Sequence, residues 1–568
     1  RQPASIARHC CPTRGAEGLW GASAPPLGAG CTCARAAAVP RGCPHFHSPA
    51  QSASECCTAA RALPARPMAG PAAGGEGGGS RAYGAQDDNA CGDTWHTLYP
   101  ATINPLLRSM QYAMRGEIYL KAQAMKAAGR DVMYLNLGNP QSLGQKPFTF
   151  NRQVLALCVG GEALLGDEAV CAALPADVVA RARELLKSTS GGVGSYTDSR
   201  GLRAVRDHVA EFITARDGTS ERCCPESIYL SDGASGAVNM CLTAVIRGRQ
   251  DGVLVPVPQY PLYSALIELH GGQFLGYELD ESHAWGFNME VLEESVRAAR
   301  AKGITPRALV FINPGNPTGQ CLSKGELQQL AAFARREKLV LMADEVYQSN
   351  VWTPERDFVS MRGALLSCEP DVRDHVELIS FHTVSKGLQG ECGLRGGYMQ
   401  LTNIHSEAEG LLYKLASVTL CANVVGQLAV DVMVKPPLEG EPSYELFAEE
   451  QSALRGSLER KARRMSAAFD ALDGMHCNSS EGALYVFPRL DLSPRAVAAA
   501  QEAERAADLF YCLELLEATG LVLVPGSGFG QKDGTWHMRT TILPPEERVE
   551  EVITKVSDFH NSFMAKYS

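Results

Sequence analysis

ALVFINPGNPTGQCLSKGELQQLAAFARREKLVLMADEVYQ, residues 308–348, is the stretch that decides the fold of this 568-residue chain. Its two short apolar runs, 308–312 and 339–343, predict buried strands. Between them the capping-box pattern SKGE (323–326) predicts the start of a helix. A strand, a helix and a second strand at this spacing indicate a parallel sheet with a crossover helix.

The rest of the body repeats this alternation of strands and helices. We therefore expect an α/β fold, with a large domain whose mostly parallel sheet is sandwiched by helices and a smaller α+β domain after about residue 420. Further buried strands are predicted at 253–257 and 377–381. Amphipathic helices are predicted at 177–192 with Asp177 as its cap, at 202–213, and at 506–520.

Composition excludes several classes of protein. The chain is 45% apolar and 20% charged, and its net charge of -10 leaves no basic footprint, so nucleic acid is not an expected partner. No run of eighteen apolar residues occurs. The best candidate, residues 417–434, contains Asn423, Gln427 and Asp431, and it predicts a buried helix. We expect no membrane partner either.

Residues 1–95 differ in composition from the body. They are rich in Ala, Gly, Pro, Arg and Cys, which predicts a disordered extension that resembles an organelle transit peptide. We expect a mitochondrial location, or a cytoplasmic one if translation starts at Met68. A metal site at Cys31, Cys33, Cys43 and His47 is the alternative for this segment. Its spacing fits no standard module, so no metal is expected.

Polar clusters follow three of the predicted strands. NPGNPTGQ (313–320), DEVYQ (344–348) and HTVSK (382–386) each come directly after an apolar run. In an open parallel sheet a ligand lies outside the carboxyl ends of the strands. The three clusters therefore predict a site at one edge of the sheet, with a lysine, Lys386, among its side chains.

Pyridoxal 5'-phosphate is a ligand that accounts for all of these groups. A lysine binds its aldehyde, an aspartate keeps its pyridine nitrogen protonated, and hydrogen-bond donors act on its phenolic oxygen. Its phosphate requires hydroxyls, a helix N-terminus and an arginine. Residues of the required types stand in or near the three clusters: Lys386 and Asp344, Tyr347 and Asn316, then Thr383, Ser385 and Arg395, with DGASGA (232–237) as a small-residue turn.

Further motifs accompany these clusters, and together they are YTDSRG, DGASG, PVPQYPLY, NPGNPTGQ, DEVYQ, SKGLQGECGLRGGY, QYAMRGEIYLKA and HMRTT. The order of these segments resembles that of a fold-type I aminotransferase, and the chain is similar to the alanine aminotransferase family from about residue 96 to its last residue. That family includes the plant-type glutamate–glyoxylate aminotransferases. The resemblance implies an N-terminal arm at 96–140 that joins the small domain, a large cofactor-binding domain at 141–420 and a small domain at 421–568.

The resemblance also implies roles for individual residues. Lys386 would be the catalytic Schiff-base lysine that moves the α-proton, and Arg539 would bind the substrate carboxylate together with Asn316 and Gly138. Tyr196 would reach the phosphate across the interface of a homodimer with shared active sites. The implied cofactor-binding residues are Ala234, Ser235, Tyr260, Asn316, Asp344, Tyr347, Thr383, Ser385, Lys386, Arg395 and Tyr196.

The implied reaction is a ping-pong transamination between amino acids and 2-oxo acids, from L-alanine and 2-oxoglutarate to pyruvate and L-glutamate. Glutamate–glyoxylate transamination, which makes glycine, is the first alternative. The same fold also hosts other chemistry. A cofactor-dependent carbon–sulfur lyase is therefore a more distant alternative, and a non-catalytic ligand-sensing module is a third.

Overall fold

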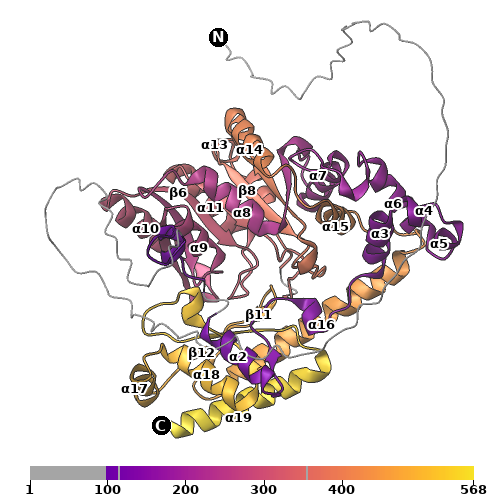
Figure 1. Ribbon diagram of the computed structural model, residues 1–568. Helices are drawn as coiled ribbons and strands as arrows, with labels where there is room; N and C mark the ends of the chain where they lie inside the picture. Colours follow the sequence, from indigo (N-terminus) through magenta and orange to yellow (C-terminus); the bar gives the residue numbers. More distant parts are fainter. Residues whose placement is uncertain (1–97, 113–115, 354–355) are drawn as a thin grey trace, which may run out of the picture. The chain divides into compact units, whose positions relative to one another are not determined.

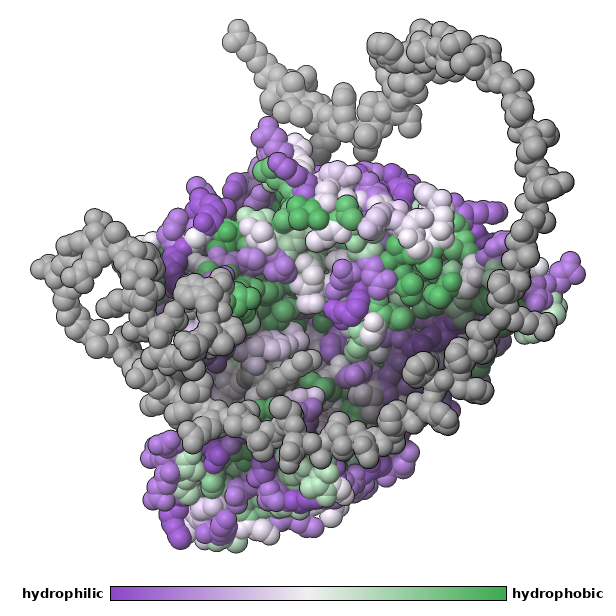
Figure 2. Space-filling model, viewed as in Figure 1, coloured by the Kyte–Doolittle hydropathy of each residue, from purple (hydrophilic) through white to green (hydrophobic). Residues whose placement is uncertain are grey.

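The computed structural model describes residues 98–112, 116–353 and 356–568 (Figure 1). The predicted extension at 1–95, with Met68 and the cysteine cluster, lies outside these ranges. Within the described ranges no helix is long and apolar enough to cross a membrane. Hydrophilic side chains cover much of the face seen in Figure 2, with separate hydrophobic patches between them.

An eight-stranded sheet forms the centre of the larger part of the fold, in the order β2-β9-β8-β7-β6-β3-β4-β5. Neighbours from β8 to β4 pair in parallel, whereas β9 runs antiparallel to β8 and to β2, and β5 runs antiparallel to β4. The strands are β2 Ile228–Ser231, β3 Asp251–Val257, β4 Gln273–Asp280, β5 Gly286–Phe287, β6 Thr305–Ile312, β7 Val340–Asp344, β8 Leu378–Thr383 and β9 Gly397–Thr402.

Helices cover both faces of this sheet, as the alternation of its side chains requires. Along β6, Leu309 and Phe311 belong to one apolar cluster, whereas Val310 and Ile312 belong to another. On the first face lie α10 Met289–Ala301, α11 Lys324–Glu337 and α12 Met361–Leu366; on the second lie α8 Gly233–Val245 and α9 Leu262–Leu269 (Figure 1). The expected mostly parallel sheet sandwiched by helices is confirmed.

Several predicted elements are confirmed with small shifts of their ends. The capping box at Ser323 and Glu326 opens α11, with both of its reciprocal hydrogen bonds present. The helix predicted at 202–213 is α7, Arg203–Asp217, and the one predicted at 506–520 is α18, Ala507–Thr519, which ends at Gly520 in the left-handed region (φ 76°).

Two helix predictions need correction. The helix predicted at 177–192 is α6, Ala176–Lys187, and Asp177 lies in its first turn instead of capping it, where its carboxylate accepts hydrogen bonds from the backbone and side chain of Ser443. The single buried helix predicted at 417–434 is divided between α14, Ser406–Val418, and α15, Val424–Val434. Asn423 accepts hydrogen bonds from two backbone N–H groups of α15 and so begins a new helix.

The N-terminal arm and the C-terminal part of the chain pack together. β1, Met133–Tyr134, pairs in parallel with β13, Leu521–Val522, and α2, Glu117–Ala127, lies beside α18 (Figure 1). A small antiparallel sheet, β11-β15-β14, completes this part. Its strands and helices are β11 Tyr485–Val486, β14 Val524–Pro525, β15 Met538–Thr541, α16 Tyr444–Asp470, α17 Pro494–Glu502 and α19 Val549–Lys566, with β10 Met475–His476 pairing β12 Arg489–Leu490.

The domain boundaries at residues 140 and 420 stay a prediction. α15 follows the second boundary, yet it packs against α7, α3 and β9 of the preceding part of the chain. The remaining helices are α1 Pro105–Ser109, α3 Thr149–Gly160, α4 Glu162–Leu165, α5 Glu168–Ala172 and α13 Pro370–Arg373.

Candidate active site

A cavity of about 540 Å³ lies at the carboxyl ends of β6, β7 and β8. These strands are parallel neighbours in register, so the chain segments that follow them meet at one edge of the sheet. Every residue that the sequence predicted for the site lines this cavity except Tyr196: Gly138, Ala234, Ser235, Tyr260, Asn316, Asp344, Tyr347, Thr383, Ser385, Lys386, Arg395 and Arg539.

Asp344 has a buried carboxyl group, and only one of its two oxygens accepts a side-chain hydrogen bond. Its Oδ2 accepts a hydrogen bond of 2.8 Å from the hydroxyl of Tyr263, whereas Oδ1 has no partner within the described ranges. Burial raises the pKa of Asp344 to about 6. The hydrogen bond from Tyr263, a backbone hydrogen bond from Val346 and the charge of Lys386 each lower it. A buried oxygen with no partner is costly, and a positively charged donor in the cavity would satisfy it.

Lys386 follows β8, and its ammonium group contacts the segment that follows β1. Its Nζ donates a hydrogen bond of 2.7 Å to the carbonyl oxygen of Gly138. A Cβ at Gly138 would lie 2.9 Å from this Nζ and would overlap the hydroxyl of Tyr485, so a side chain at this position would displace one or both groups. The lysine therefore lies at the junction of the sheet edge, the N-terminal arm and β11.

An anion cradle lies at the N-terminus of α8. Arg395 donates hydrogen bonds to Ser235 Oγ (3.3 Å) and to Ser385 Oγ (3.5 Å), and the Thr383 hydroxyl lies 3.2 Å from Ser385 Oγ. α8 begins at Gly233, and the first backbone N–H groups of a helix attract anions. Hydroxyls, a guanidinium and helix N–H groups together suit a doubly charged phosphate.

The Arg395 guanidinium lies so close to the first residue of α8, Gly233, that a side chain at position 233 would collide with it. A Cβ at Gly233 would lie 2.6 Å from the Arg395 guanidinium. Arg395 itself lies in the left-handed region, with φ 54°, a conformation that costs a residue with a side chain free energy. The Arg395 guanidinium donates hydrogen bonds of 3.0 Å to the carbonyl oxygens of Asp232 and Cys392, and these bonds offset the backbone strain.

Arg539, on β15, brings a second guanidinium into the cavity. It is fully buried, and it donates hydrogen bonds to Asn316 Oδ1 (3.0 Å) and to the carbonyl oxygen of Asn136 (2.5 Å). Its Nε has no partner in the described part of the chain. Burial lowers the pKa of Arg539 from its ordinary value, but a guanidinium stays charged at neutral pH. An incoming carboxylate would find here a buried cation with an unused donor.

Among the residues that line or support the cavity and were not predicted from the sequence, four have ionisable side chains. Tyr485, Cys392 and Tyr112 line it, and the hydroxyl of Tyr112 lies 3.2 Å from that of Tyr260. Tyr263 supports Asp344 from behind. Tyr112 stands in the motif QYAMRG and could have been found there. Tyr263 stands in the motif PVPQYPLY and Cys392 in SKGLQGECGLRGGY, so they also lie in motifs that carry the resemblance. Tyr485 occurs in an apolar stretch that looks like core, and no local signal separates it from core residues.

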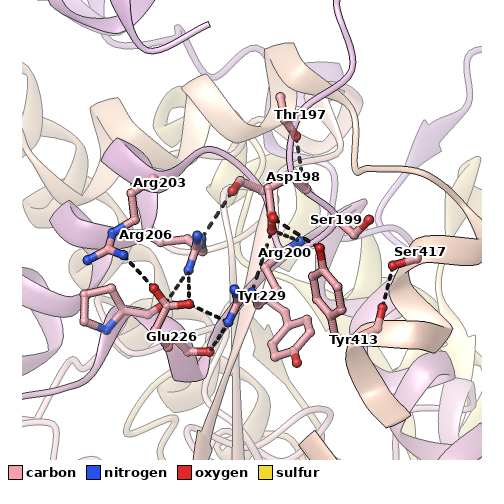
Figure 3. Close-up of polar contacts among 12 residues, drawn as sticks. Thr197, Asp198, Ser199, Arg200, Arg203, Arg206, Glu226, Tyr229, Tyr413 and Ser417 are labelled. Atoms are coloured by element: carbon pink, nitrogen blue, oxygen red, sulfur yellow. Dashed lines mark hydrogen bonds and ion pairs between the residues drawn. The ribbon is translucent and has the colours of Figure 1, made fainter. Parts of the chain in front are cut away.

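Tyr196 does not line the cavity, and its side chain is 75% exposed. The segment that follows it is anchored on this chain (Figure 3). Arg200 forms an ion pair of 2.5 Å with Glu226, and Tyr413 donates a hydrogen bond of 3.3 Å to Asp198. Tyr196 thus projects outward from a segment that ion pairs and hydrogen bonds hold in place.

Residues 153–556 match the family described as aminotransferase class I and II. The chain belongs to this family. The protein named glutamate–glyoxylate aminotransferase 2 of Arabidopsis thaliana is 49% identical over 467 residues, which are 82% of this chain and 96% of the relative. A probable mitochondrial alanine aminotransferase of Dictyostelium discoideum is 47% identical over 475 residues, 81% of this chain and 88% of the relative.

Solved structures agree with the fold of this aminotransferase. An aminotransferase from Escherichia coli superposes with a TM-score of 0.63 at 25% identity, and the match covers 81% of this chain and 98% of that one. Class I and II aminotransferases depend on pyridoxal phosphate and act on amino acids and 2-oxo acids. The free oxygen of Asp344, the anion cradle and the ammonium group of Lys386 fit three separate groups of that cofactor.

Proposed function

We propose that this aminotransferase binds pyridoxal 5'-phosphate in the cavity and transfers amino groups between amino acids and 2-oxo acids. The observation that carries the proposal is the meeting of Lys386, the free Oδ1 of Asp344 and the Arg395 cradle in one cavity. When bound, the cofactor supplies an electron sink for the charge left by a departing α-proton. All other steps depend on side chains of the chain.

In this proposal Asp344 Oδ1 would accept a hydrogen bond from the protonated pyridine nitrogen, and Tyr263 fixes the orientation of the carboxylate. Asn316 and Tyr347 orient the phenolic oxygen, and their own contact of 3.5 Å supports the arrangement. Tyr260 packs on the ring. The phosphate is bound by Ala234, Ser235, Thr383, Ser385 and Arg395.

Lys386 is the residue that would hold the aldehyde end of the cofactor, and its amino group would act on the substrate when it is free. Its Nζ takes the proton from the substrate's α-carbon and later returns a proton, as a general base and acid in turn. Arg539 binds the α-carboxylate with its guanidinium fork, and Asn316 and the backbone at Gly138 complete the pocket. These contacts hold the α-carbon within reach of Lys386.

For the substrates we propose L-alanine and 2-oxoglutarate, which give pyruvate and L-glutamate. Transamination of glyoxylate by glutamate is the second candidate, and the high identity to the Arabidopsis protein of that name favours it. The two candidates differ in the acceptor. Each therefore predicts a different product from the same purified protein.

We further propose a homodimer in which Tyr196 of each chain reaches the phosphate site of its partner. The exposure of Tyr196 on an anchored segment supports this arrangement. Mixed refolding of Lys386→Ala with Tyr196→Ala tests it, because hybrid dimers would carry one complete site. Activity that does not return above that of either variant would count against a shared site.

The mitochondrial name of the Dictyostelium relative supports a mitochondrial location for this chain. A cytoplasmic location follows instead if translation starts at Met68. Imaging of the chain with a fluorescent protein at its C-terminus, with and without residues 1–67, distinguishes the two. Mitochondrial signal only from the longer form is the expected result.

The decisive experiment follows the half-reaction. We expect purified protein to bind pyridoxal phosphate with visible absorbance, and this absorbance to bleach on addition of L-alanine or L-glutamate. Lys386→Ala should abolish the bleaching, whereas Lys302→Ala, an exposed lysine after α10, should leave it intact. Product analysis with 2-oxoglutarate or glyoxylate then selects the acceptor. Release of pyruvate with ammonia and without glutamate would refute transamination in favour of a lyase.

A further inference from the structure

Tyr485 is a buried residue of the cavity that the proposed function leaves without a role. It lies on β11, which pairs antiparallel with β15 so that Tyr485 faces Thr541. Arg539 is two residues from Thr541 on the same strand, and its side chain therefore lies on the same face as that of Tyr485. The guanidinium carbon of Arg539 is 4.1 Å from the centroid of the Tyr485 ring.

The ring of Tyr485 thus supports the proposed carboxylate anchor. The guanidinium carbon also lies 4.6 Å from the centroid of the Phe529 ring. Two aromatic rings therefore contact a cation that donates hydrogen bonds to Asn316 and Asn136. A cation buried in this way is stabilised by the electron-rich face of a ring. The ring also restricts the directions in which the guanidinium can turn, and it holds Arg539 in the lining of the cavity.

The hydroxyl of Tyr485 has a second set of partners. It accepts a hydrogen bond of 3.2 Å from the hydroxyl of Tyr347, which lies 3.5 Å from the side-chain nitrogen of Asn316. Gly138 makes room for it, since a Cβ there would overlap this oxygen. Burial acts to raise the pKa of Tyr485, but the charges of Lys386 and Arg539 and the hydrogen bond from Tyr347 lower it below its usual range.

A tyrosine hydroxyl has one proton to give and two lone pairs to accept. In the described arrangement Tyr347 donates to Tyr485. If the Tyr347 hydroxyl donates its hydrogen bond to the phenolic oxygen of a bound cofactor, the Tyr485 hydroxyl can donate a hydrogen bond to the Tyr347 oxygen. The contact therefore persists with its direction reversed, and it holds Tyr347 in place.

We propose that Tyr485 is a positioning residue with two separable parts: its ring orients Arg539 toward the substrate carboxylate, and its hydroxyl orients Tyr347 toward the phenolic oxygen of the cofactor. The inference rests on the proposed function. It assigns a joint role to a residue from the C-terminal part, which links the substrate anchor to the cofactor site of the large sheet.

The two parts are tested by two variants of the cofactor-loaded protein. Tyr485→Phe keeps the ring and removes the hydroxyl; Tyr485→Leu removes both. The first readout is the pH midpoint of the visible absorbance, which reports donation to the phenolic oxygen. The second is the dissociation constant of glutarate, a dicarboxylate without an oxo group that binds but does not react. Tyr229→Phe is the matched control, because it removes a buried hydroxyl outside the cavity.

Tyr485→Phe should raise the absorbance midpoint by roughly half to one pH unit, the equivalent of one hydrogen bond, and leave glutarate binding within twofold. Tyr485→Leu should show the same midpoint shift and bind glutarate roughly tenfold more weakly, as expected for loss of a desolvated cation–π contact. Tyr229→Phe should change neither readout.

A Tyr485→Phe variant with an unchanged midpoint would overturn the role of the hydroxyl. Unchanged glutarate binding in Tyr485→Leu, or equal loss of binding in both variants, would overturn the role of the ring. Absence of visible absorbance in the wild-type protein with added pyridoxal phosphate would instead refute the proposed function, so the two failures are distinguishable.

Discussion

The buried carboxyl group of Asp344 is expected to lower the folding stability of the cofactor-free protein and to strengthen cofactor binding. It is 6% exposed, and burial raises its pKa to about 6 from the ordinary value of 3.8. Asp344→Asn keeps an oxygen that can accept the hydrogen bond from Tyr263 but removes the charge. We expect the cofactor-free variant to gain stability relative to wild type as pH rises, and to lose affinity for pyridoxal phosphate.

Proton linkage determines whether the free energy of unfolding rises or falls with pH. The folded protein holds the Asp344 proton more tightly than the unfolded chain, so the cost of the buried charge is absent below pH 3.8 and grows as pH rises to about 6. At 1.36 kcal/mol per pH unit the full cost is about 3 kcal/mol. In an experiment between pH 5 and 8, only the part of this range from pH 5 to about 6 contributes. The free energy of unfolding of the wild type should therefore fall by about 1.4 kcal/mol relative to the variant.

Urea denaturation of both cofactor-free proteins at pH 5, 6, 7 and 8, followed by circular dichroism, measures this difference. Burial also raises the pKa of Glu345, to about 7, so wild-type stability falls with pH for two reasons. Because the charge of Asp344 also helps to raise the pKa of Glu345, subtraction of the variant's curve reports Asp344 together with its effect on Glu345. Parallel curves would refute the buried charge, and unchanged affinity for pyridoxal phosphate would refute its pairing with the pyridine nitrogen.

Three further substitutions test other parts of the site. Arg539→Lys should raise KM for amino acid donors by roughly a hundredfold while the cofactor absorbance stays unchanged, because lysine lacks the bidentate fork; steady-state kinetics and a spectrum check this. Arg395→Gln should weaken pyridoxal phosphate binding at least tenfold in a fluorescence titration, with an unaltered circular dichroism spectrum, because the cradle loses its cation. Gly138→Ala should lower kcat, because the new Cβ displaces Lys386 and Tyr485; a normal kcat would contradict the close approach.

Local patterns in the sequence were enough to predict four parallel strands of the eight-stranded sheet, β3, β6, β7 and β8, and the polar clusters at the ends of three of them. Apolar runs and the capping box at Ser323 identify strands and a helix because side-chain periodicity and end-capping act within a few residues. Parallel order then brings the carboxyl ends of β6, β7 and β8 together. Asn316, Asp344 and Lys386 could therefore be assigned to one site without coordinates.

Other features of the site depended on contacts between distant parts of the chain. Tyr485 lies on a two-residue strand, and only its pairing with β15 turns the ring to Arg539. Tyr263 reaches Asp344 because α9 packs on β3, and Gly138 meets Lys386 because the N-terminal arm joins β13. Local periodicity determines which segments are helix or strand. Which buried hydroxyl meets which charge is decided by the packing of whole elements, since burial and long-range register set those distances.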